Sequence, residues 1–141
     1  AYNDDIQALF LDPIKEVFFT ELGLDEEDVI YVPGLFEDVC GLQGVALIPG
    51  LANLVVFNPE GETSKLLIAD PFFRTDVADR GTDPFIADFE ASMPAEHELV
   101  WVDDWNDYHL LWGEVHCGTN VVRTPTIDWW ADADALDLLG E

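Results

Sequence analysis

Residues 45–69, VALIPGLANLVVFNPEGETSKLLIA, alternate short apolar runs with turn-forming residues, and this alternation is the clearest indication of fold class in the chain. The runs are rich in Val, Ile and Leu, which is typical of strands bounded by turns. Pro49-Gly50 and Asn58-Pro59-Glu60-Gly61 separate them, because proline and glycine favour turns. The pattern predicts strands at Val45–Ile48, Leu54–Phe57 and Leu66–Ala69, with the last two paired as a hairpin.

A helix and a further strand are expected after this hairpin. Asp83-Pro84 is a typical helix start, with the aspartate as N-cap and the proline at the first helical position. Apolar residues then recur at helical spacing up to Pro94, and Glu98–Val102 has the composition of a strand. The order strand, strand, helix, strand from Val45 to Val102 predicts one compact α/β unit.

The N-terminal part carries similar signals. Asp12-Pro13 predicts the start of a short amphipathic helix that continues at helical spacing to Leu22 and stops at Gly23. The β-branched and aromatic run Val29–Val32, stopped by Pro33-Gly34, predicts a buried strand. Because no repeat or linker divides the chain, residues 1–141 are expected to form a single unit.

Composition narrows the possible partners. The chain has 141 residues, 30 acidic against 5 basic side chains, and a formal net charge of −25. Nucleic-acid binding is not expected, because it needs clustered Lys and Arg, which here are scattered singly. A hydrophobic content of 49% favours a folded protein despite the charge. Such a surface attracts cationic partners, although solubility alone explains most acidic surfaces.

The sequence constrains the cellular location of the protein less than its partners. The longest apolar stretch, Val45–Phe57, is shorter than a membrane span and is interrupted by Pro49, so no membrane interaction is predicted. No basic region followed by an apolar one begins the chain, so no signal peptide is predicted. We expect a soluble protein, cytoplasmic or secreted. Its two cysteines, Cys40 and Cys117, allow at most one disulfide, and Cys40 is expected to be a small buried hydrophobic residue.

Thiol, imidazole and carboxylate side chains come together in residues 113–120, GEVHCGTN. Cys117 is a candidate nucleophile if its surroundings favour the thiolate, and Gly118 gives a substrate access to it. His116 is expected to shape the pocket rather than exchange a proton with Cys117, because adjacent residues of an extended segment point to opposite faces. On the residues alone, an inert buried cysteine beside a packing histidine is the commoner arrangement.

The run Gly113–Val121, preceded by Tyr108-His109 and followed by Trp129-Trp130, resembles the C-terminal signature of the protein-arginine deiminases. The resemblance covers roughly Val17 to Trp130, most of the chain. Weaker correspondences occur in the same order upstream, at Val32–Phe36, Ile48-Pro49, Asn53–Val55, Asp70–Phe72 and Asp104.

This resemblance implies a fold and an incomplete site. The family fold is a five-bladed α/β propeller of strand-strand-helix-strand modules, and this chain is similar to its last two blades. Two carboxylates that grip the substrate guanidinium, and a histidine that acts as acid and base, lie upstream of the matched region in that family. The resemblance therefore implies that the chain alone is inactive and that its partner is the missing upstream part of its own catalytic domain.

The implied activity is hydrolysis of the arginine guanidinium group in a protein or peptide substrate, giving citrulline and ammonia. Cys117 is implied as the nucleophile and His116 as a substrate-binding residue, whereas His109 is expected to pack in the core. Several family members have Arg at the position of Leu111. Its absence leaves open whether the substrate is protein arginine, free arginine or another guanidine.

Calcium is a cofactor that the resemblance allows. The acidic clusters Asp76-Asp79-Asp83, Asp103-Asp104-Asp107 and Asp132-Asp134-Asp137 supply oxygen ligands, but none has the spacing of a known calcium loop. We therefore expect these clusters to be solvated faces, with Asp104 fixing the loop before Tyr108.

Two other functions compete with the deiminase hypothesis. The first is a non-enzymatic binding or scaffold domain that reuses the fold and recognises basic partners through its acidic surface. The second is another cysteine amidohydrolase or peptidase, with His109 or His97 as the base.

Overall fold

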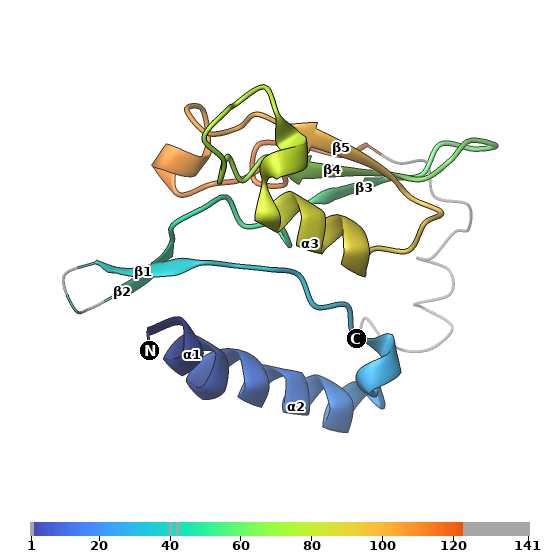
Figure 1. Cartoon of the computed structure of the whole chain (residues 1–141). Coiled ribbons are helices and arrows are strands. Elements are labelled where there is room, and N and C mark those ends of the chain that lie inside the picture. Colours follow the sequence, from blue (N-terminus) through green and yellow to red (C-terminus); the bar gives the residue numbers. More distant parts are fainter. Residues whose placement is uncertain (1, 40, 42, 123–141) are drawn as a thin grey trace, which may run out of the picture.

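The computed structural model describes residues 2–39, 41 and 43–122, and they form a mixed α/β structure. Figure 1 shows a sheet and helix at one side of the molecule and an N-terminal helix at the other, with a hairpin between them. The main elements are α1 (Tyr2–Ile6), α2 (Asp12–Leu22), β1 (Phe36–Val39), β2 (Gln43–Ala46), β3 (Val55–Phe57), β4 (Lys65–Ala69), α3 (Pro84–Ser92) and β5 (Glu98–Val102).

The C-terminal unit, β3–β4–α3–β5, confirms the predicted order of strand, strand, helix and strand. β3 and β4 form the expected antiparallel hairpin, with Val55 opposite Leu67. β5 lies parallel to β4 on its other side, with Leu67 opposite Val100, because α3 carries the chain back to the same end of the sheet. The carboxyl ends of β4 and β5 therefore lie side by side.

The core of this unit lies between α3 and the sheet (Figure 1). Ile68 and Phe89 are fully buried, and Leu51 and Leu66 complete the buried cluster. The rings of Phe89 and Trp101 meet edge to face, with centroids 5.5 Å apart. Removing these side chains from water stabilises the folded unit by roughly 1.5–3 kcal/mol each.

A buried ion network fixes the start of α3. Asp83 caps the helix as predicted, since its carboxylate accepts from the backbone N–H of Phe85 at 3.0 Å. Its other oxygen lies 3.2 Å from Nη1 of Arg74, which also contacts Asp70 at 2.6 Å. Burial by itself would raise the pKa of Asp70, but hydrogen bonds from Arg74 and Arg80 outweigh it and lower the pKa.

The N-terminal helix begins earlier than predicted. Asp12 has helical backbone angles and is no N-cap, because α1 and a π-helical turn at Gln7–Leu11 lead into α2 without a break. A proline inside a helix lacks an N–H and crowds the carbonyl four residues back. The wider π turn immediately before Pro13 relieves this crowding. The predicted stop is correct, since Gly23 takes the left-handed conformation with φ of 68°.

The predicted buried strand at Val29–Val32 is wrong. This segment follows a single 3-10 turn, Glu26–Asp28, and among the described residues it pairs with no strand. Side chains hold it instead: Tyr31 donates to Glu26 at 2.7 Å and accepts from Lys15 at 2.7 Å. Ile30 and Tyr31 are exposed, while Val32 packs against the core of the C-terminal unit.

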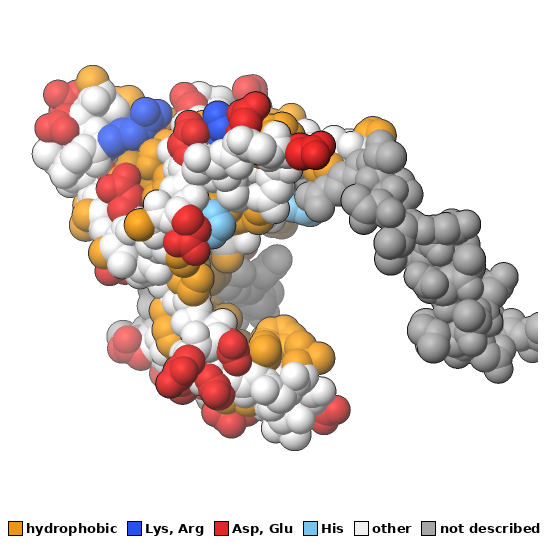
Figure 2. All heavy atoms as spheres, turned by 90° about the vertical axis from the view of Figure 1, so that its right-hand side faces the viewer, with side chains coloured by type: hydrophobic (Ala, Val, Ile, Leu, Met, Phe, Trp, Pro, Cys, Tyr) orange, Lys and Arg blue, Asp and Glu red, His pale blue; other side chains and the backbone are white. Residues whose placement is uncertain are grey.

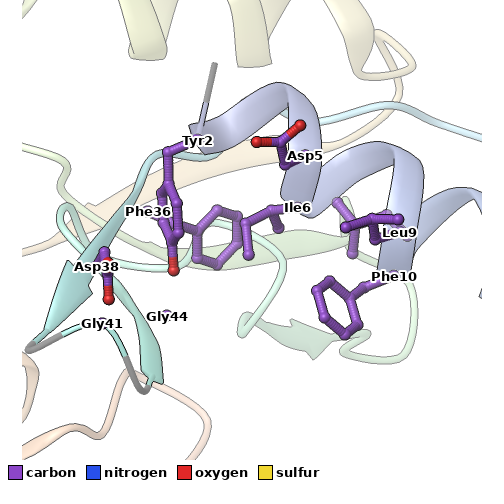
Figure 3. Close-up of a pocket in the computed structure, with 10 residues that line it drawn as sticks. Tyr2, Asp5, Ile6, Leu9, Phe10, Phe36, Asp38, Gly41 and Gly44 are labelled. Atoms are coloured by element: carbon purple, nitrogen blue, oxygen red, sulfur yellow. The ribbon is translucent and has the colours of Figure 1, made fainter.

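The β1–β2 hairpin is a second, separate sheet. The sequence pattern missed β1, and β2 runs from Gln43 to Ala46 instead of the predicted Val45–Ile48. Asn3 joins α1 to this hairpin by exchanging two hydrogen bonds with the backbone of Phe36, at 2.7 and 3.0 Å. A cavity of about 530 Å³ lies between α1 and the hairpin, with Tyr2, Ile6 and Phe36 on its walls (Figure 3).

The helix α1–α2 leaves apolar side chains open to solvent. In the space-filling view the part formed by this helix stands apart from the larger C-terminal part, with hydrophobic side chains visible on it (Figure 2). A hollow of about 670 Å³ separates this helix from Val32 and Leu51. The exposed apolar residues of the helix are Leu9, Phe10, Leu11, Ile14, Val17, Phe18 and Leu22.

The remaining sequence predictions concern membrane spans and residues near or beyond the ends of the described segments. No helix within residues 2–39, 41 and 43–122 is long and apolar enough to cross a membrane. Cys40, Trp129-Trp130 and the acidic cluster at Asp132, Asp134 and Asp137 lie outside the described residues.

Candidate functional site

Cys117 lies in a turn that projects beyond the carboxyl ends of β4 and β5. The N–H of Gly118 donates to the carbonyl of Glu114 at 3.2 Å, and the N–H of Thr119 donates to the carbonyl of His116 at 3.1 Å. Val115 is buried against Val55 and Ala69, which anchors the turn on the sheet. The turn therefore buries the side chains of Glu114 and Val115 and leaves those of His116 and Cys117 exposed.

Asn53 connects this turn to the chain just before β3. Its side-chain oxygen accepts from the backbone N–H of His116 at 3.1 Å, and its Nδ2 donates to Sγ of Cys117 at 3.3 Å. One amide side chain thus orients the turn and approaches the sulfur. Sequence reasoning did not assign a role to Asn53, because its partners are 63 and 64 residues away along the chain.

The surroundings of Cys117 favour its thiolate. Hydrogen bonding from the backbone N–H of Glu114 lowers the pKa of the thiol, and the Asn53 amide lowers it further. Slight desolvation and the negative charge of Glu114 act in the opposite direction but are outweighed. An exposed thiol with a lowered pKa has the properties of a nucleophile rather than of an inert core cysteine.

Three buried titratable side chains lie beneath the turn. Nδ1 of His109 is 3.0 Å from Oε1 of Glu114, and the His109 ring lies tilted against Trp105, with the ring centroids 4.7 Å apart. Asp104 is only 2% exposed, and His109 and Glu114 are each 8% exposed. His109 is therefore a core residue, as predicted.

Asp104 holds its proton unusually tightly. Burial raises the pKa of Asp104 to about 6, and the charge and hydrogen bond of Glu114 add to the effect, while the positive form of His109 opposes it. Neither carboxyl oxygen of Asp104, nor Oε2 of Glu114, receives a hydrogen bond from an N–H or O–H group of another described residue. A proton on Asp104, present below about pH 6, connects one of its oxygens to Glu114.

The backbone around this cluster is tightly folded. The carbonyl of Asp104 accepts from the N–H groups of Tyr108 and His109, at 2.9 and 3.1 Å, so the loop before Tyr108 is held by the backbone of Asp104 and not by its carboxyl group. The Tyr108 ring lies against Gly118, where a Cβ atom would collide with it. Glycine at position 118 thus serves close packing in addition to access.

The structure does not join the side chains of the predicted site residues His116 and His97 to Cys117. His116 and Cys117 lie on a turn instead of an extended segment, and no hydrogen bond joins their side chains within the described part of the chain. His97 precedes β5, whereas Asp104 follows it. A five-residue strand spans about 17 Å, so His97 lies at the far end of the strand from the Cys117 turn.

The acidic clusters within the described part of the chain do not form a metal site. Among residues 2–39, 41 and 43–122, no group of three or more His, Cys, Asp or Glu side chains is arranged to hold a metal ion. Asp76, Asp79, Asp103 and Asp107 are exposed, as expected of a solvated face. For Asp83 and Asp104 that expectation is wrong, because both are buried, one as a helix cap and the other beside Glu114. The described residues therefore do not fit calcium.

Fold and site together define a mixed α/β protein that presents a thiolate-favouring cysteine on an exposed turn. Comparison with known proteins gives the family. The model of the protein-arginine deiminase family matches residues 2–131, and the chain belongs to this family.

The relatives are much longer proteins. The chain is 35% identical over 125 residues to protein-arginine deiminase type-3 of Rattus norvegicus, covering 82% of this chain and 16% of the relative. It is 34% identical over 138 residues to the human type-3 protein, covering 92% of this chain and 18% of that protein. For human protein-arginine deiminase type-4 the identity is 31% over 117 residues, covering 82% and 17%. The chain thus corresponds to less than a fifth of each relative.

Proposed function

We propose that this chain is the nucleophile-bearing part of a hydrolase that converts arginine guanidinium groups to citrulline and ammonia. The observation that carries the proposal is the exposed Cys117 thiol, whose pKa is lowered by Glu114 and Asn53. Membership of the protein-arginine deiminase family supports arginine-bearing protein or peptide as the substrate. The strongly acidic composition suits a cationic substrate.

The chemistry requires a strong nucleophile because a guanidinium is planar and resonance-stabilised. The Cys117 thiolate attacks the central carbon, forming a C–S bond and a tetrahedral adduct. A protonated histidine gives its proton to the departing nitrogen, the C–N bond breaks and ammonia leaves. Water, deprotonated by the same histidine, then attacks the thiouronium carbon, and the C–S bond breaks to release citrulline and regenerate the thiolate.

The described residues do not supply the rest of this machinery. His109 and Glu114 are buried and bound to one another, so neither is placed to grip a guanidinium or to act on Cys117. The two hollows around α1 are not lined by Cys117. In our proposal the acid–base histidine and the guanidinium-binding carboxylates come from sequence outside the described residues, in keeping with a chain that corresponds to under a fifth of its relatives.

Upstream sequence also accounts for the exposed apolar face of α1–α2. In our proposal the β3–β4–α3–β5 unit is one blade of a five-bladed α/β propeller, and α1 to β2 belong to the preceding blade. A helix that presents Leu9, Val17 and Phe18 to solvent needs a partner, because burial of each such side chain yields roughly 1.5–3 kcal/mol. The neighbouring blade provides that partner.

Residues next to Cys117 then select the substrate. Leu111 is 78% exposed and Trp112 is 76% exposed, so both are free to line the entrance to the site. His116 is exposed beside the nucleophile, with its backbone held by Asn53. An aliphatic Leu111 makes no hydrogen bond to a peptide backbone, and we therefore expect weaker dependence on peptide context than in relatives with Arg at this position.

The test is ammonia release from an arginine peptide by a protein in which the chain is preceded by its upstream sequence. We expect activity there and none from the 141-residue chain alone. Cys117→Ala should reduce the rate by at least about 10³-fold, because the covalent step is lost. Activity of the short chain, or activity that survives Cys117→Ala, would overturn the proposal.

Thiol labelling separates the competing functions. A haloacetamidine, which mimics guanidinium, should label Cys117 of the longer protein faster than iodoacetamide does, with peptide mapping to distinguish Cys117 from Cys40. Equal rates would favour another cysteine hydrolase. Binding of basic peptides without ammonia release would favour a scaffold.

A further inference from the structure

The cluster beneath the turn, Asp104, His109 and Glu114, has no part in the chemistry above. It is nevertheless buried and directly connected to the turn that carries Cys117. Burying three titratable groups is unfavourable unless they satisfy one another. We therefore asked what this buried cluster holds in place next to Cys117.

Glu114 is the link between the cluster and the turn. Its side chain points inward, where Oε1 meets Nδ1 of His109 at 3.0 Å. Its backbone carbonyl points outward and accepts from the N–H of Gly118 at 3.2 Å, which closes the turn around Cys117. The same residue is therefore fixed at one end by the core and at the other end by the nucleophile's own turn.

The surroundings leave the Glu114 side chain little alternative. His109 contacts it from the 3-10 turn at 109–111, and Asp104 faces it from the segment after β5. From the segment before β3, Gly50 lies so close that an added Cβ would be 3.9 Å from Cγ of Glu114. The titratable groups facing Glu114 are thus Asp104 and His109, with the Cys117 thiol at its outer side.

We propose that Glu114 is a positioning residue for Cys117: its buried side chain, held by His109 at 3.0 Å and facing Asp104, fixes the turn that carries the thiol. This inference deepens the proposed function, since it names what prepares the nucleophile. It concerns the thiol itself, however, and is tested without a turnover assay.

Two effects of Glu114 on Cys117 have opposite signs, which makes the test decisive. The negative charge of its side chain disfavours the thiolate, whereas its backbone N–H favours it. Glu114→Gln removes the charge but keeps the shape, with an amide oxygen for His109 and an N–H for Asp104. Glu114→Ala removes both the charge and the anchor. Charge alone predicts faster alkylation in both variants, and positioning predicts slower alkylation in Glu114→Ala.

The experiment measures the rate of iodoacetamide alkylation of Cys117 between pH 5.5 and 9 in the 141-residue chain, resolved from Cys40 by peptide mapping. At pH 6.5 we expect Glu114→Ala to react about tenfold more slowly than the parent, the change in thiolate fraction for one unit of thiol pKa. Glu114→Gln should react as fast as the parent or faster. Ile86→Val, at a buried position of α3 outside the cluster that anchors the turn, is the control for general destabilisation and should leave the profile unchanged.

A rate in Glu114→Ala equal to or above that of Glu114→Gln would overturn the proposal. If Glu114→Ala does not fold, a second pair of variants decides. Asp104→Asn keeps an N–H that can donate to Glu114 and should retain the parent rate, whereas Asp104→Ala should be slowed. Equal rates in that pair would overturn the proposal as well. If the longer parent protein released no ammonia while the Glu114 and Asp104 variants showed the expected thiol profiles, the proposed function would fail and this inference would stand.

Discussion

The C-terminal unit and the N-terminal helix α1–α2 both carry many apolar residues, but they place them differently. In the C-terminal unit Ile68 and Phe89 are fully buried between α3 and the sheet. In the helix no residue is buried, and Val17 is 56% exposed. Apolar content alone therefore does not give stability. The first region has both layers that a core needs, and the second has only one of them.

The largest expected contrast is between Phe89→Ala and Phe18→Ala. Phe89 is enclosed, so its removal leaves a cavity and should lower the free energy of unfolding by about 3–5 kcal/mol. Phe18 is 50% exposed, and its removal should change that energy by no more than about 0.5–1 kcal/mol. Urea unfolding of the two variants measures the difference. Equal losses would mean that α2 shares the core.

The pH dependence of stability should also come from the C-terminal unit. Because the pKa of Asp104 is raised to about 6, the folded state binds its proton more tightly than the unfolded state. This stabilisation is complete below about pH 3.9 and is lost as the pH rises through 6, an effect of about 3 kcal/mol at most. Asp70 has the opposite sign, but its lowered pKa confines its effect to more acidic pH.

Asp104→Asn should abolish this dependence, which urea midpoints between pH 4 and 7 would detect. Two exposed carboxylates serve as controls, Asp107 in the same loop and Glu16 on α2. Asp107→Asn and Glu16→Gln should keep the parent slope. A slope unchanged in Asp104→Asn would show that another group holds the proton.

The smallest expected effects come from two matched glycines. Gly23 ends α2 and Gly61 lies in the β3–β4 turn; both have positive φ, 68° and 77°, and neither would bring a Cβ within 4 Å of another group. Alanine should cost about 1 kcal/mol at each position. Gly61→Ala should therefore lower the global unfolding energy by that amount.

Gly23→Ala should act locally, if α2 opens independently of the C-terminal unit. Hydrogen exchange should then speed up about fivefold in the α2 amides and remain unchanged in β4 and β5, since 1 kcal/mol corresponds to about that factor. Faster exchange throughout the chain would show that the two regions unfold together.

The same sequence signal had different outcomes in the two regions. Asp83-Pro84 starts a helix because Asp83 leaves the preceding 3-10 turn (Arg80–Thr82) in an extended conformation and caps the helix, with Arg74 on its second oxygen. Asp12-Pro13 lies inside a longer helix because the residues before it are also helical. An Asp-Pro pair indicates only that a helix can begin at that position. Whether it begins depends on the chain that precedes it.

Strand signals show a related limit. Glu98–Val102 became β5 because β4 offers it a parallel partner. Val29–Val32 has similar composition but finds no partner strand among the described residues, and it remains an extended segment. Strand propensity describes side chains that suit a pleated surface, whereas a strand requires hydrogen bonds from a neighbour.

For the site, the short motif indicated Cys117 as a candidate nucleophile but not what surrounds it. Cysteine, glycine and their neighbours in residues 113–120 are local, and they determine where the candidate thiol lies. The sequence by itself thus determined the strand-strand-helix-strand unit, the acidic character and the candidate thiol. All of these depend on residues within about one element of each other.

Only the tertiary structure decided which groups act on that thiol. Asn53 reaches Cys117 across 64 residues, and Asp104 meets Glu114 because the chain between them folds into successive hydrogen-bonded turns. Hydrogen bonds and pKa shifts depend on separations of a few ångströms and on burial. These quantities are fixed by packing between elements, so no local pattern carries them.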